Sequence, residues 1–158
     1  MKLHLGCGVK RLDGFLNVDL KNSDRDCDIR SLRSVFDDES AEEIMAIHVC
    51  EHFYIHDIAD ILEQWLHVLK PGGKLILELP CWDKVIEHIK QGSPDNMTRW
   101  PLFGDPRTHT DGEPALHKWI YSRAEFKKLL GYVGFNNIKE ETPHYHVASR
   151  DMRWTAER

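Results

Sequence analysis

Glycine and acidic residues follow the first two apolar stretches of the sequence, and their types suit ligand binding. Gly6 and Gly8 come directly after the stretch Lys2–Leu5, and Asp19 lies near the end of the next one. Glycine lets a ligand approach the backbone closely, and a carboxylate can accept hydrogen bonds from both hydroxyls of a ribose. The pattern predicts a site for an adenosine-type ligand. Because the third glycine of a dinucleotide motif is absent, we expect this ligand to lack a pyrophosphate.

Histidines form a second group of residues that could do chemistry. His48, His52 and His56 have the spacing i, i+4, i+8, which would align three metal ligands on a helix. The stretch 44–49 reads instead as a strand, which breaks this register, so we expect no metal site. A histidine can accept a proton from a hydroxyl near neutral pH, which makes His48 and His52 candidates for a catalytic base. Glu51 and His52 could also serve only to organise their loop by hydrogen bonding.

The stretch 91–121 supplies the remaining catalytic candidates. It is rich in proline, glycine, aspartate and aromatic residues, and it contains His109 and His117. We favour His117, because its surroundings, LHKWIY, suit an ordered segment better than PRTHTDG does around His109. Aromatic side chains in and just before this stretch suit recognition of a sugar or another ring, and equally suit a hydrophobic lid. They are Trp82, Trp100, Phe103, Trp119 and Tyr121.

Strands and helices in alternation must position these residues. Strands are expected at residues 2–5, 15–20, 25–29, 43–49, 74–80, 136–142 and 147–157. The alternation predicts an α/β fold with a mostly parallel sheet, helices on both faces and an antiparallel C-terminal hairpin. Because the carboxyl ends of parallel strands share one edge, we expect the glycine, aspartate and histidine candidates to meet there.

Cap and turn residues delimit the expected helices. Helices are expected at residues 55–70, 83–90 and 122–134. The first ends at the Pro-Gly-Gly segment 71–73, and in the last one Ser122 and Glu125 form a capping box while Gly134 provides the end. Only residues 9–14 separate the glycine loop from the second strand, so we expect the first helix of the fold to be reduced.

Length and composition indicate one soluble domain that spans residues 1–158. The formal charge of −5 argues against a nucleic-acid partner, because proteins that bind the phosphate backbone usually carry a basic excess. The sequence shows no signal peptide and no apolar run long enough to span a membrane. Its scattered cysteines form no CxxC pair, which favours a reducing, cytoplasmic location. They are Cys7, Cys27, Cys50 and Cys81.

Several segments occur in the order of the motifs of a known family. They are LHLGCG, GFLNVDL, CDI, IHVCEHF and LKPGGKLILELP. Together they resemble the motif series of the class I S-adenosylmethionine-dependent methyltransferases. The segments HKWIYSRAEFKKLLGYVGF and RDMRWTAER are similar to the C-terminal pattern of a compact group of these enzymes, often found near glycan and cell-surface biosynthesis enzymes. The resemblance covers nearly the whole chain and implies a Rossmann-like fold.

The resemblance also implies a cofactor, S-adenosyl-L-methionine, and the residues that hold it. Gly6, Cys7 and Gly8 match the loop that lies against the methionine part of the cofactor. Asp19 matches the acidic residue that binds the ribose hydroxyls. Leu20 matches the position that packs against the adenine.

Four further residues match cofactor-binding positions of the family. Asp28 and Ile29 match the pair that meets the adenine after the third strand. His48 and Val49 match positions beneath the sulfonium and the methionine. The sequence departs from the family at His4, which stands where an acidic residue usually helps to place the methionine ammonium group.

The resemblance implies methyl transfer to a small molecule or glycan, and we expect a hydroxyl to be the acceptor group. His117, His52 and His48 are the catalytic candidates for that reaction. The departure at His4, together with the lack of a leading helix, leaves an alternative open, in which the chain is a catalytically inactive binding or accessory subunit. A homodimer could cover a site that its own helices leave open.

Overall fold

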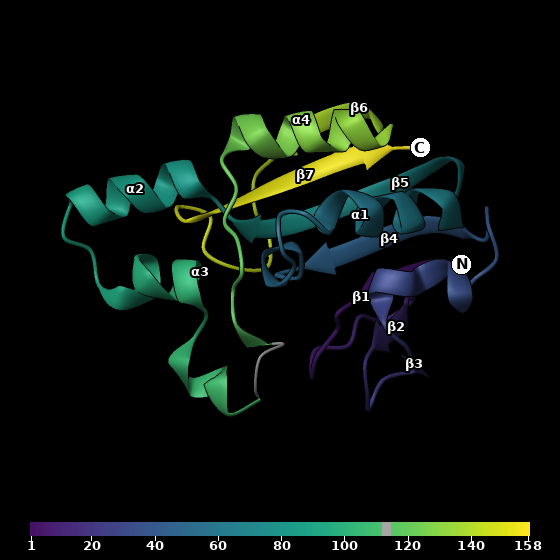
Figure 1. Cartoon of the computed structure of the whole chain (residues 1–158), viewed down its shortest axis with the longest axis horizontal. Coiled ribbons are helices and arrows are strands. Elements are labelled where there is room, and N and C mark those ends of the chain that lie inside the picture. The colour runs from purple at the N-terminus through teal and green to yellow at the C-terminus, as the bar shows by residue number, and fades with distance from the viewer. Residues whose placement is uncertain (112–114) are drawn as a thin grey trace.

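The computed structural model describes residues 1–111 and 115–158, with the backbone alone for residues 109–111. Its strands form one seven-stranded sheet in the order β3-β2-β1-β4-β5-β7-β6 (Figure 1). The strands are β1 (Lys2–Leu5), β2 (Leu16–Asp19), β3 (Arg25–Asp26), β4 (Ala41–Ile47), β5 (Leu69–Pro80), β6 (Asn136–Glu141) and β7 (Asp151–Glu157).

The pairing of the strands confirms the predicted sheet. Strands β1 to β5 pair in parallel, whereas β7 is antiparallel to both of its neighbours, β5 and β6. The carboxyl ends of β1, β2, β4 and β5 therefore share one edge of the sheet, and β7 begins at that same edge. Segments that follow β1 and β4 can contribute side chains to a common site there.

The helices include three of the expected segments. The α-helices are α1 (Ile58–Val68), α2 (Trp82–Lys90), α3 (Arg99–Phe103) and α4 (Arg123–Val133), and the short 3-10 helices are η1 (Ile29–Ser34), η2 (Cys50–His52), η3 (Asp95–Met97) and η4 (Pro106–Asp111). The capping box predicted for α4 is present, with Ser122 accepting from the Glu125 backbone and Glu125 accepting from the Ser122 backbone. Gly134 ends the same helix in the left-handed conformation, at a φ of 113°.

The hydrophobic core lies between the sheet and helices α1 and α4. Helix α1 buries Leu62 and Trp65, and helix α4 buries Phe126 and Leu130. The Trp65 ring Nε1 also donates a hydrogen bond of 2.8 Å to the carbonyl oxygen of Ile29. Because this donor is buried, the bond avoids the free energy cost of an unpaired polar group and fixes η1 against α1.

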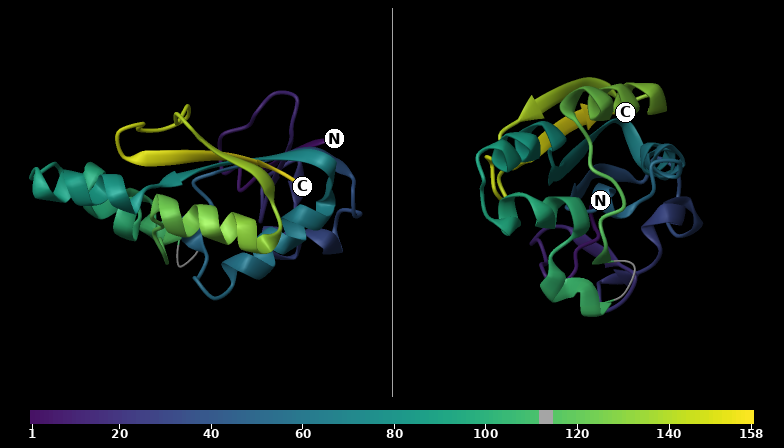
Figure 2. Two further views of the ribbon diagram at one scale, coloured as in Figure 1. Left: turned by 90° about the horizontal axis from the view of Figure 1, so that it is seen from above. Right: turned by 60° about the vertical axis from the view of Figure 1, so that its left-hand side comes forward.

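The prediction of helices on both faces was wrong. Figure 2 shows α1 and α4 on one side of the strands, whereas the segment after β1 and the loop between β6 and β7 lie on the other side. A helical crossover between parallel strands needs about a dozen residues or more. The connections 6–15 and 20–24 are shorter than that, so they contain no helix, in line with the expected reduction of the first helix.

Several strand boundaries also differ from the predictions: β4 is Ala41–Ile47 and β7 begins at Asp151, and the third and fifth strands differ as follows. The third strand is only Arg25–Asp26, because Asp28 already accepts a hydrogen bond from the backbone of Arg30 and caps η1. The fifth strand is longer than expected. It begins at Leu69 and includes the segment 70–73 that was predicted to be a turn, because Leu69 pairs with Ala41 before a register shift in the ladder.

Candidate functional site

The glycine loop after β1 folds back onto the end of β2. The backbone N–H groups of Gly6 and Cys7 both donate to the carbonyl oxygen of Val18, at 2.8 and 3.2 Å. The backbone N–H of Gly8 donates to Asp19 Oδ2 at 2.7 Å. The structure thus brings Gly6, Cys7, Gly8 and Asp19 together, as the sequence predicted for the two strand ends.

Gly6 also brings the glycine loop against the segment after β4. Its φ is +65°, and a Cβ atom built on it would lie 2.5 Å from Cγ2 of Val49. Only glycine allows this approach without displacing the valine. Gly6 follows β1 and Val49 follows β4, and Val49 is buried. The two residues expected beside the methionine part of the cofactor are therefore in contact.

Asp19 and Leu20 have the free groups that a nucleoside would need. Each carboxylate oxygen of Asp19 already accepts one backbone hydrogen bond, from Gly8 and from Leu20 at 2.7 Å each. A carboxylate oxygen can accept a second bond, so both remain available to ribose hydroxyls. The Leu20 side chain is 55% exposed, and it offers an apolar surface beside Asp19 on which an adenine could pack. These residues fit S-adenosylmethionine.

Asp28 and Ile29 lie at the start of η1, in the connection that follows β3. Ile29 is buried, whereas Asp28 is half-buried and holds Arg30 through both carboxylate oxygens, at 3.0 and 2.6 Å. Hydrogen bonds from the side chain and the backbone of Arg30, together with its charge, keep the pKa of Asp28 below its ordinary value. Asp28 is therefore a carboxylate at neutral pH, able to accept a hydrogen bond from an adenine amino group.

His48 lies between two buried carboxylates at the end of β4. Its Nδ1 is 2.8 Å from Glu51 Oε1, and its Nε2 is 3.1 Å from Asp151 Oδ2. Burial alone would lower the pKa of His48, but the charges of Glu51 and Asp151 outweigh it and raise the pKa to about 9. The backbone of His48 has a φ of +55°, in the left-handed region that only a few per cent of residues other than glycine adopt, histidine, asparagine and aspartate most often among them. Strained backbone of this kind often occurs at functional sites.

Glu51 is the most enclosed charged group of this edge. Its side chain is fully buried, and neither carboxylate oxygen has a hydrogen-bond partner among the described residues. The contact of 2.8 Å with His48 Nδ1 is close enough for an ion pair, although its direction is not that of a hydrogen bond. Burial favours the neutral acid, but the nearby His48 outweighs it and lowers the pKa of Glu51 to about 2. Glu51 is thus a buried carboxylate with an unused oxygen.

The other two catalytic candidates, His52 and His117, converge on Glu51. The two imidazole rings meet edge to face, with centroids 4.8 Å apart, and ligand atoms of His52, His117 and Glu51 all lie within 4.8 Å of one another. His117 lies in the segment 115–119, called the strap below. Glu51 holds this strap in place, because its backbone carbonyl accepts hydrogen bonds from the backbone N–H groups of Lys118 and Trp119 at 2.7 and 3.2 Å. The structure therefore groups all three predicted histidines around one carboxylate.

Sequence reasoning missed Asp151 and His146. Asp151 is buried and accepts hydrogen bonds from His48, Arg150 and the backbone of Val147. The His146 ring lies 4.1 Å from that of His48, between ring centroids. Both residues come from the β6–β7 region, about a hundred positions after His48 in the sequence. No local pattern therefore connects them with His48. The one available signal is an acidic residue, Asp151, inside the otherwise mixed stretch 147–157 that was expected to form the last strand.

His56 and His109 do not join this group of described side chains. His56 is exposed and stacks on Tyr54, with ring centroids 5.4 Å apart, so the spacing of three histidines does not produce one cluster. The side chain of His109 lies outside the described residues. Cys7 is buried, and this burial raises the pKa of its thiol, so the cysteine between the two glycines fills space and is not an activated nucleophile.

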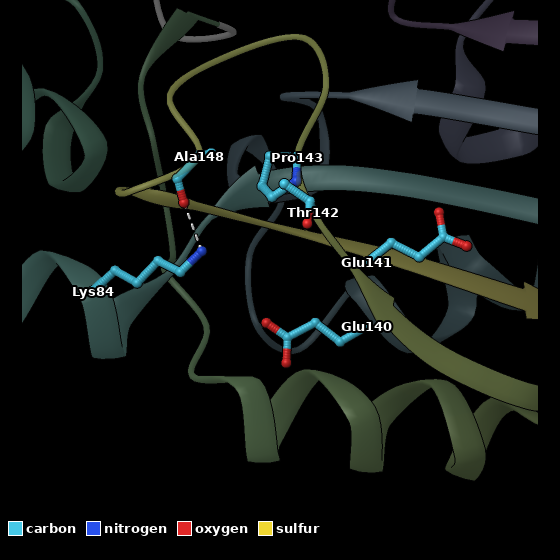
Figure 3. Close-up of a pocket in the computed structure, with 6 residues that line it drawn as sticks. All are labelled: Lys84, Glu140, Glu141, Thr142, Pro143 and Ala148. Carbon is cyan, nitrogen blue, oxygen red and sulfur yellow. Dashed lines mark hydrogen bonds between the residues drawn. The ribbon is translucent and has the colours of Figure 1, made fainter.

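A hollow lies at the β6 end of the sheet, away from the glycine loop. It has a volume of about 530 Å³ and is lined by Lys84, Glu140, Glu141, Thr142, Pro143 and Ala148 (Figure 3). Its charged groups already have partners within the chain. Lys84 donates to the carbonyl of Ala148 at 2.7 Å, Glu140 pairs with Arg123, and Glu141 pairs with Arg153. The hollow therefore offers a ligand no free charge, and the chemistry points to the edge around Glu51.

Comparisons with known proteins address the fold and the type of domain. Residues 15–77 match the family model described as a methyltransferase domain. No curated protein matches the chain. Within the described residues, no helix has the length and apolar character needed to cross a membrane.

Three similar solved structures span different methyltransferases. A SAM-dependent methyltransferase from Archaeoglobus fulgidus aligns with a TM-score of 0.67 at 16% identity, over 99% of this chain and 85% of that one. A SAM-dependent methyltransferase from Thermotoga maritima, described as a possible histamine N-methyltransferase, aligns with a TM-score of 0.65 at 12% identity, over 99% and 81%. The CurJ carbon methyltransferase aligns with a TM-score of 0.63 at 17% identity, over 99% of this chain but only 47% of that one.

At these identities the structural likeness shows the fold, which is the Rossmann-like class I fold that the sequence predicted. The family match adds the domain type, and the groups around Asp19 fit the cofactor. The chain therefore has the fold of the class I S-adenosylmethionine-dependent methyltransferases and matches a methyltransferase-domain model over residues 15–77, and its residues around Asp19 fit S-adenosylmethionine.

Proposed function

We propose that the chain is an S-adenosylmethionine-dependent methyltransferase that acts on a hydroxyl group of a small molecule or glycan. The observation that carries the proposal is the convergence of Glu51, His52 and His117 directly after β4. Val49, in the same segment, contacts the glycine loop at Gly6. Groups able to bind a hydroxyl therefore stand next to the residues that fit the methionine part of the cofactor.

The residues of the chain have three tasks in this reaction. S-adenosylmethionine, when bound, supplies a methyl group that its sulfonium already activates. The chain must hold the acceptor oxygen in line with the methyl group and keep water away. It must also receive the hydroxyl proton as the oxygen–carbon bond forms and the carbon–sulfur bond breaks. We assign the binding of the hydroxyl and of its proton to His52 and His117.

His48 has a different part in this proposal. Both of its ring nitrogens face carboxylates, those of Glu51 and Asp151, so it has no free nitrogen for the acceptor. We therefore assign His48 a positioning role, in which it holds the carboxylate of Glu51 toward His52 and His117.

Exposed aromatic side chains beside this group suit an acceptor with a ring. Trp119 and Phe103 are 40% and 62% exposed. The backbone of Trp119 donates to the Glu51 carbonyl, and the backbone of His117 donates to the Phe103 carbonyl, so both aromatic residues adjoin the histidines. Flat apolar faces next to hydrogen-bonding groups are typical of sugar and ring recognition.

The acceptor atom follows from this group of residues and not from the fold. Two structural neighbours are described as a carbon methyltransferase and as a possible N-methyltransferase. The same fold thus serves different acceptor atoms, and the choice of a hydroxyl rests on the histidines and Glu51.

Cofactor binding is tested with Asp19→Ala. We expect the variant to bind S-adenosylmethionine at least about tenfold more weakly than wild type, because hydrogen bonds to a charged group contribute roughly 1.5–3 kcal/mol each. Isothermal titration calorimetry measures the change. Asp13→Ala, which removes an exposed carboxylate of the same connection, is the control and should bind like wild type. Equal affinity of Asp19→Ala and wild type would contradict the assignment.

A binding or accessory subunit without catalysis is the second candidate function, and His4 favours it. This residue is buried, and its Nδ1 lies 3.0 Å from Asn17 Oδ1. Burial lowers the pKa of His4, so the ring is neutral and offers no negative charge to the methionine ammonium. Release of S-adenosylhomocysteine with any hydroxyl acceptor would exclude this alternative. Cofactor binding without turnover across sugar and phenol acceptors would support it against our proposal.

A further inference from the structure

We propose that Glu51, His52 and His117 form a binding site for a divalent transition-metal ion such as Zn²⁺. One ligand atom from each side chain lies within 4.8 Å of the other two. Two imidazoles and one carboxylate are a donor set that binds Zn²⁺ or Fe²⁺ in proteins and leaves coordination positions open for a substrate. The triad differs from the histidine series in the sequence, because it includes Glu51 and His117 in place of His48 and His56.

The hydrogen bonds of both histidines leave the correct nitrogen available. Nδ1 of His52 lies 3.1 Å from the carbonyl oxygen of Leu116, and Nδ1 of His117 lies 2.9 Å from that of Pro101. A carbonyl oxygen only accepts, so each Nδ1 carries the hydrogen and each neutral ring has its lone pair on Nε2. Histidines that bind metals almost always donate their other N–H to a carbonyl or carboxylate in this way. Both rings are therefore already set for ligation.

Glu51 provides an independent observation that points to a cation. Its side chain is 0% exposed, and its Oε2 has no partner at all among the described residues. A buried carboxylate oxygen without a hydrogen-bond partner costs free energy, even though His48 contacts the other oxygen. A cation bound between Glu51 and the two histidines would supply the missing partner. The structure places ligand atoms of His52 and His117 within 4.8 Å of a carboxylate oxygen of Glu51.

The surroundings of Glu51 have the form of a supporting shell. His48 contacts Oε1 of Glu51 and is itself held by Asp151, so the carboxylate is oriented from behind. The backbone carbonyl of Glu51 accepts from Lys118 and Trp119, which fixes the strap that carries His117. Partners of this kind orient metal ligands in proteins.

A second group with suitable residue types lacks these properties. His48, His146 and Asp151 also offer atoms within 4.8 Å of one another. However, both nitrogens of His48 face carboxylates, and Asp151 already accepts from His48 and Arg150. This group has satisfied its own hydrogen bonds, so we place the ion at Glu51, His52 and His117 alone.

The role of the ion in methyl transfer rests on the proposed function, whereas its binding does not. An open coordination position would hold the acceptor hydroxyl oxygen and make its proton easier to remove. His52 and His117 would then hold the acceptor through the ion in place of receiving its proton, which would pass to solvent. The substrate class stays that of a small molecule or glycan with a hydroxyl group.

The test is titration of the full chain, freed of metal with a chelator, with Zn²⁺ in a calorimeter. We expect one equivalent to bind to wild type. We expect Glu51→Gln, His52→Ala and His117→Ala each to weaken the binding at least about tenfold, since loss even of a supporting residue usually weakens it 10–100-fold. His56→Ala is the matched control, because this exposed histidine of the same region lies outside the triad. It should bind Zn²⁺ like wild type.

Two results would overturn the site: wild type that binds no Zn²⁺, or His117→Ala that binds as tightly as wild type. Circular dichroism checks that each variant folds. If Glu51→Gln does not fold, the two histidine variants and the visible spectrum of wild type with Co²⁺, which reports nitrogen ligands, decide the matter. Cofactor titration of the same samples separates the two proposals. Unchanged S-adenosylmethionine binding with no Zn²⁺ binding removes the metal site and leaves the proposed function intact.

Discussion

Gly6 and Gly8 have similar backbone conformations but different surroundings. Their φ angles are +65° and +53°. A Cβ atom on Gly6 would meet Val49 at 2.5 Å, whereas a Cβ atom on Gly8 would meet nothing within 4 Å. The pair therefore separates two effects of a glycine, its conformational freedom and its lack of a side chain.

Substitution of the two glycines should destabilise the fold to different extents. We expect Gly8→Ala to lower the free energy of unfolding by about 1–2 kcal/mol, the cost of the left-handed conformation. Gly6→Ala should lower it by about a further 1–3 kcal/mol, because the methyl group overpacks against Val49. Urea unfolding measures both values. Addition of Val49→Ala should restore part of the loss in Gly6→Ala only, and equal losses for the two single variants would rule out the clash.

For single residues, the sequence predicted contacts whose partners lie close together along the chain. The link of the glycine loop to Asp19 followed from strand order, and the structure confirms that they meet at 2.7 Å. The setting of His48 could not be predicted, because its partner Asp151 lies 103 positions away. Burial of Glu51 was equally hidden. A glutamate in a polar stretch normally indicates a surface, and only the packing of the 115–119 strap covers it.

Helix α4 begins with a pair of side chains that satisfy each other and the backbone. Glu125 Oε2 accepts from the backbone and hydroxyl of Ser122 at 2.9 and 2.7 Å. The Ser122 Oγ in turn accepts from the Glu125 backbone at 3.2 Å. These bonds use N–H groups that a helix start leaves free. The helix then lies where Phe126 and Leu130 reach the core.

Loss of this cap should be measurable as a change in stability. We expect Ser122→Ala to lower the free energy of unfolding by about 1 kcal/mol, because the backbone N–H of Glu125 loses its partner. Ser122→Thr keeps the hydroxyl and should stay within about 0.5 kcal/mol of wild type. Thermal unfolding compares the two, and a Thr variant as unstable as the Ala variant would show that the hydroxyl is not the cause.

Elements were predictable where a local pattern determines them. Helices α1 and α4 were found from apolar spacing and caps, which depend on residues close in sequence. The third strand was overestimated because a stretch with Arg25 and Asp28 carries no clear period, and the cap at Asp28 starts η1 instead. The length of β5 depends on pairing with β4 through Leu69 and Ala41, which is tertiary information.

Over the whole molecule, the face of the sheet without helices is covered by loops and contains buried polar groups. Glu78 on β5 is 1% exposed. Its carboxylate accepts from the backbone N–H groups of His144, Tyr145 and His146, each at 2.9 Å, and pairs with Arg153 at 3.2 Å. One carboxylate thus holds the β6–β7 loop over the sheet in place of a helix.

Glu78 should therefore be far more important for stability than its neighbour Glu141. Both carboxylates pair with Arg153, but the Glu141 side chain is 40% exposed. We expect Glu78→Gln to destabilise the fold by about 3 kcal/mol or more, because it breaks a buried pair. Glu141→Gln should cost less than about 1 kcal/mol, as exposed pairs usually do. Chemical unfolding measures the free energy of unfolding of both variants. Similar losses of stability in the two would contradict the anchoring role of Glu78.

The fold class was predictable at this scale, whereas the covering of the sheet was not. The mostly parallel sheet and its antiparallel end follow from the alternation of elements and from the family motifs. A second helical layer was expected because a mostly apolar strand such as β5 is typical of a sheet covered by helices on both faces. The structure does not have this layer. The polar side chains of Glu78 and Arg153 break this pattern, and loops satisfy them.

The position of β7 has a consequence for the synthesis of the chain. This strand, Asp151–Glu157, pairs along the whole apolar part of β5, from Lys74 to Pro80. Translation proceeds at about 5–20 residues per second, so β5 leaves the ribosome on the order of ten seconds before its partner. During that interval an apolar strand at the centre of the future sheet has an open edge, which is a template for aggregation. Chaperones that bind extended apolar segments should therefore matter most for nascent chains that have passed residue 80 and not yet reached residue 151.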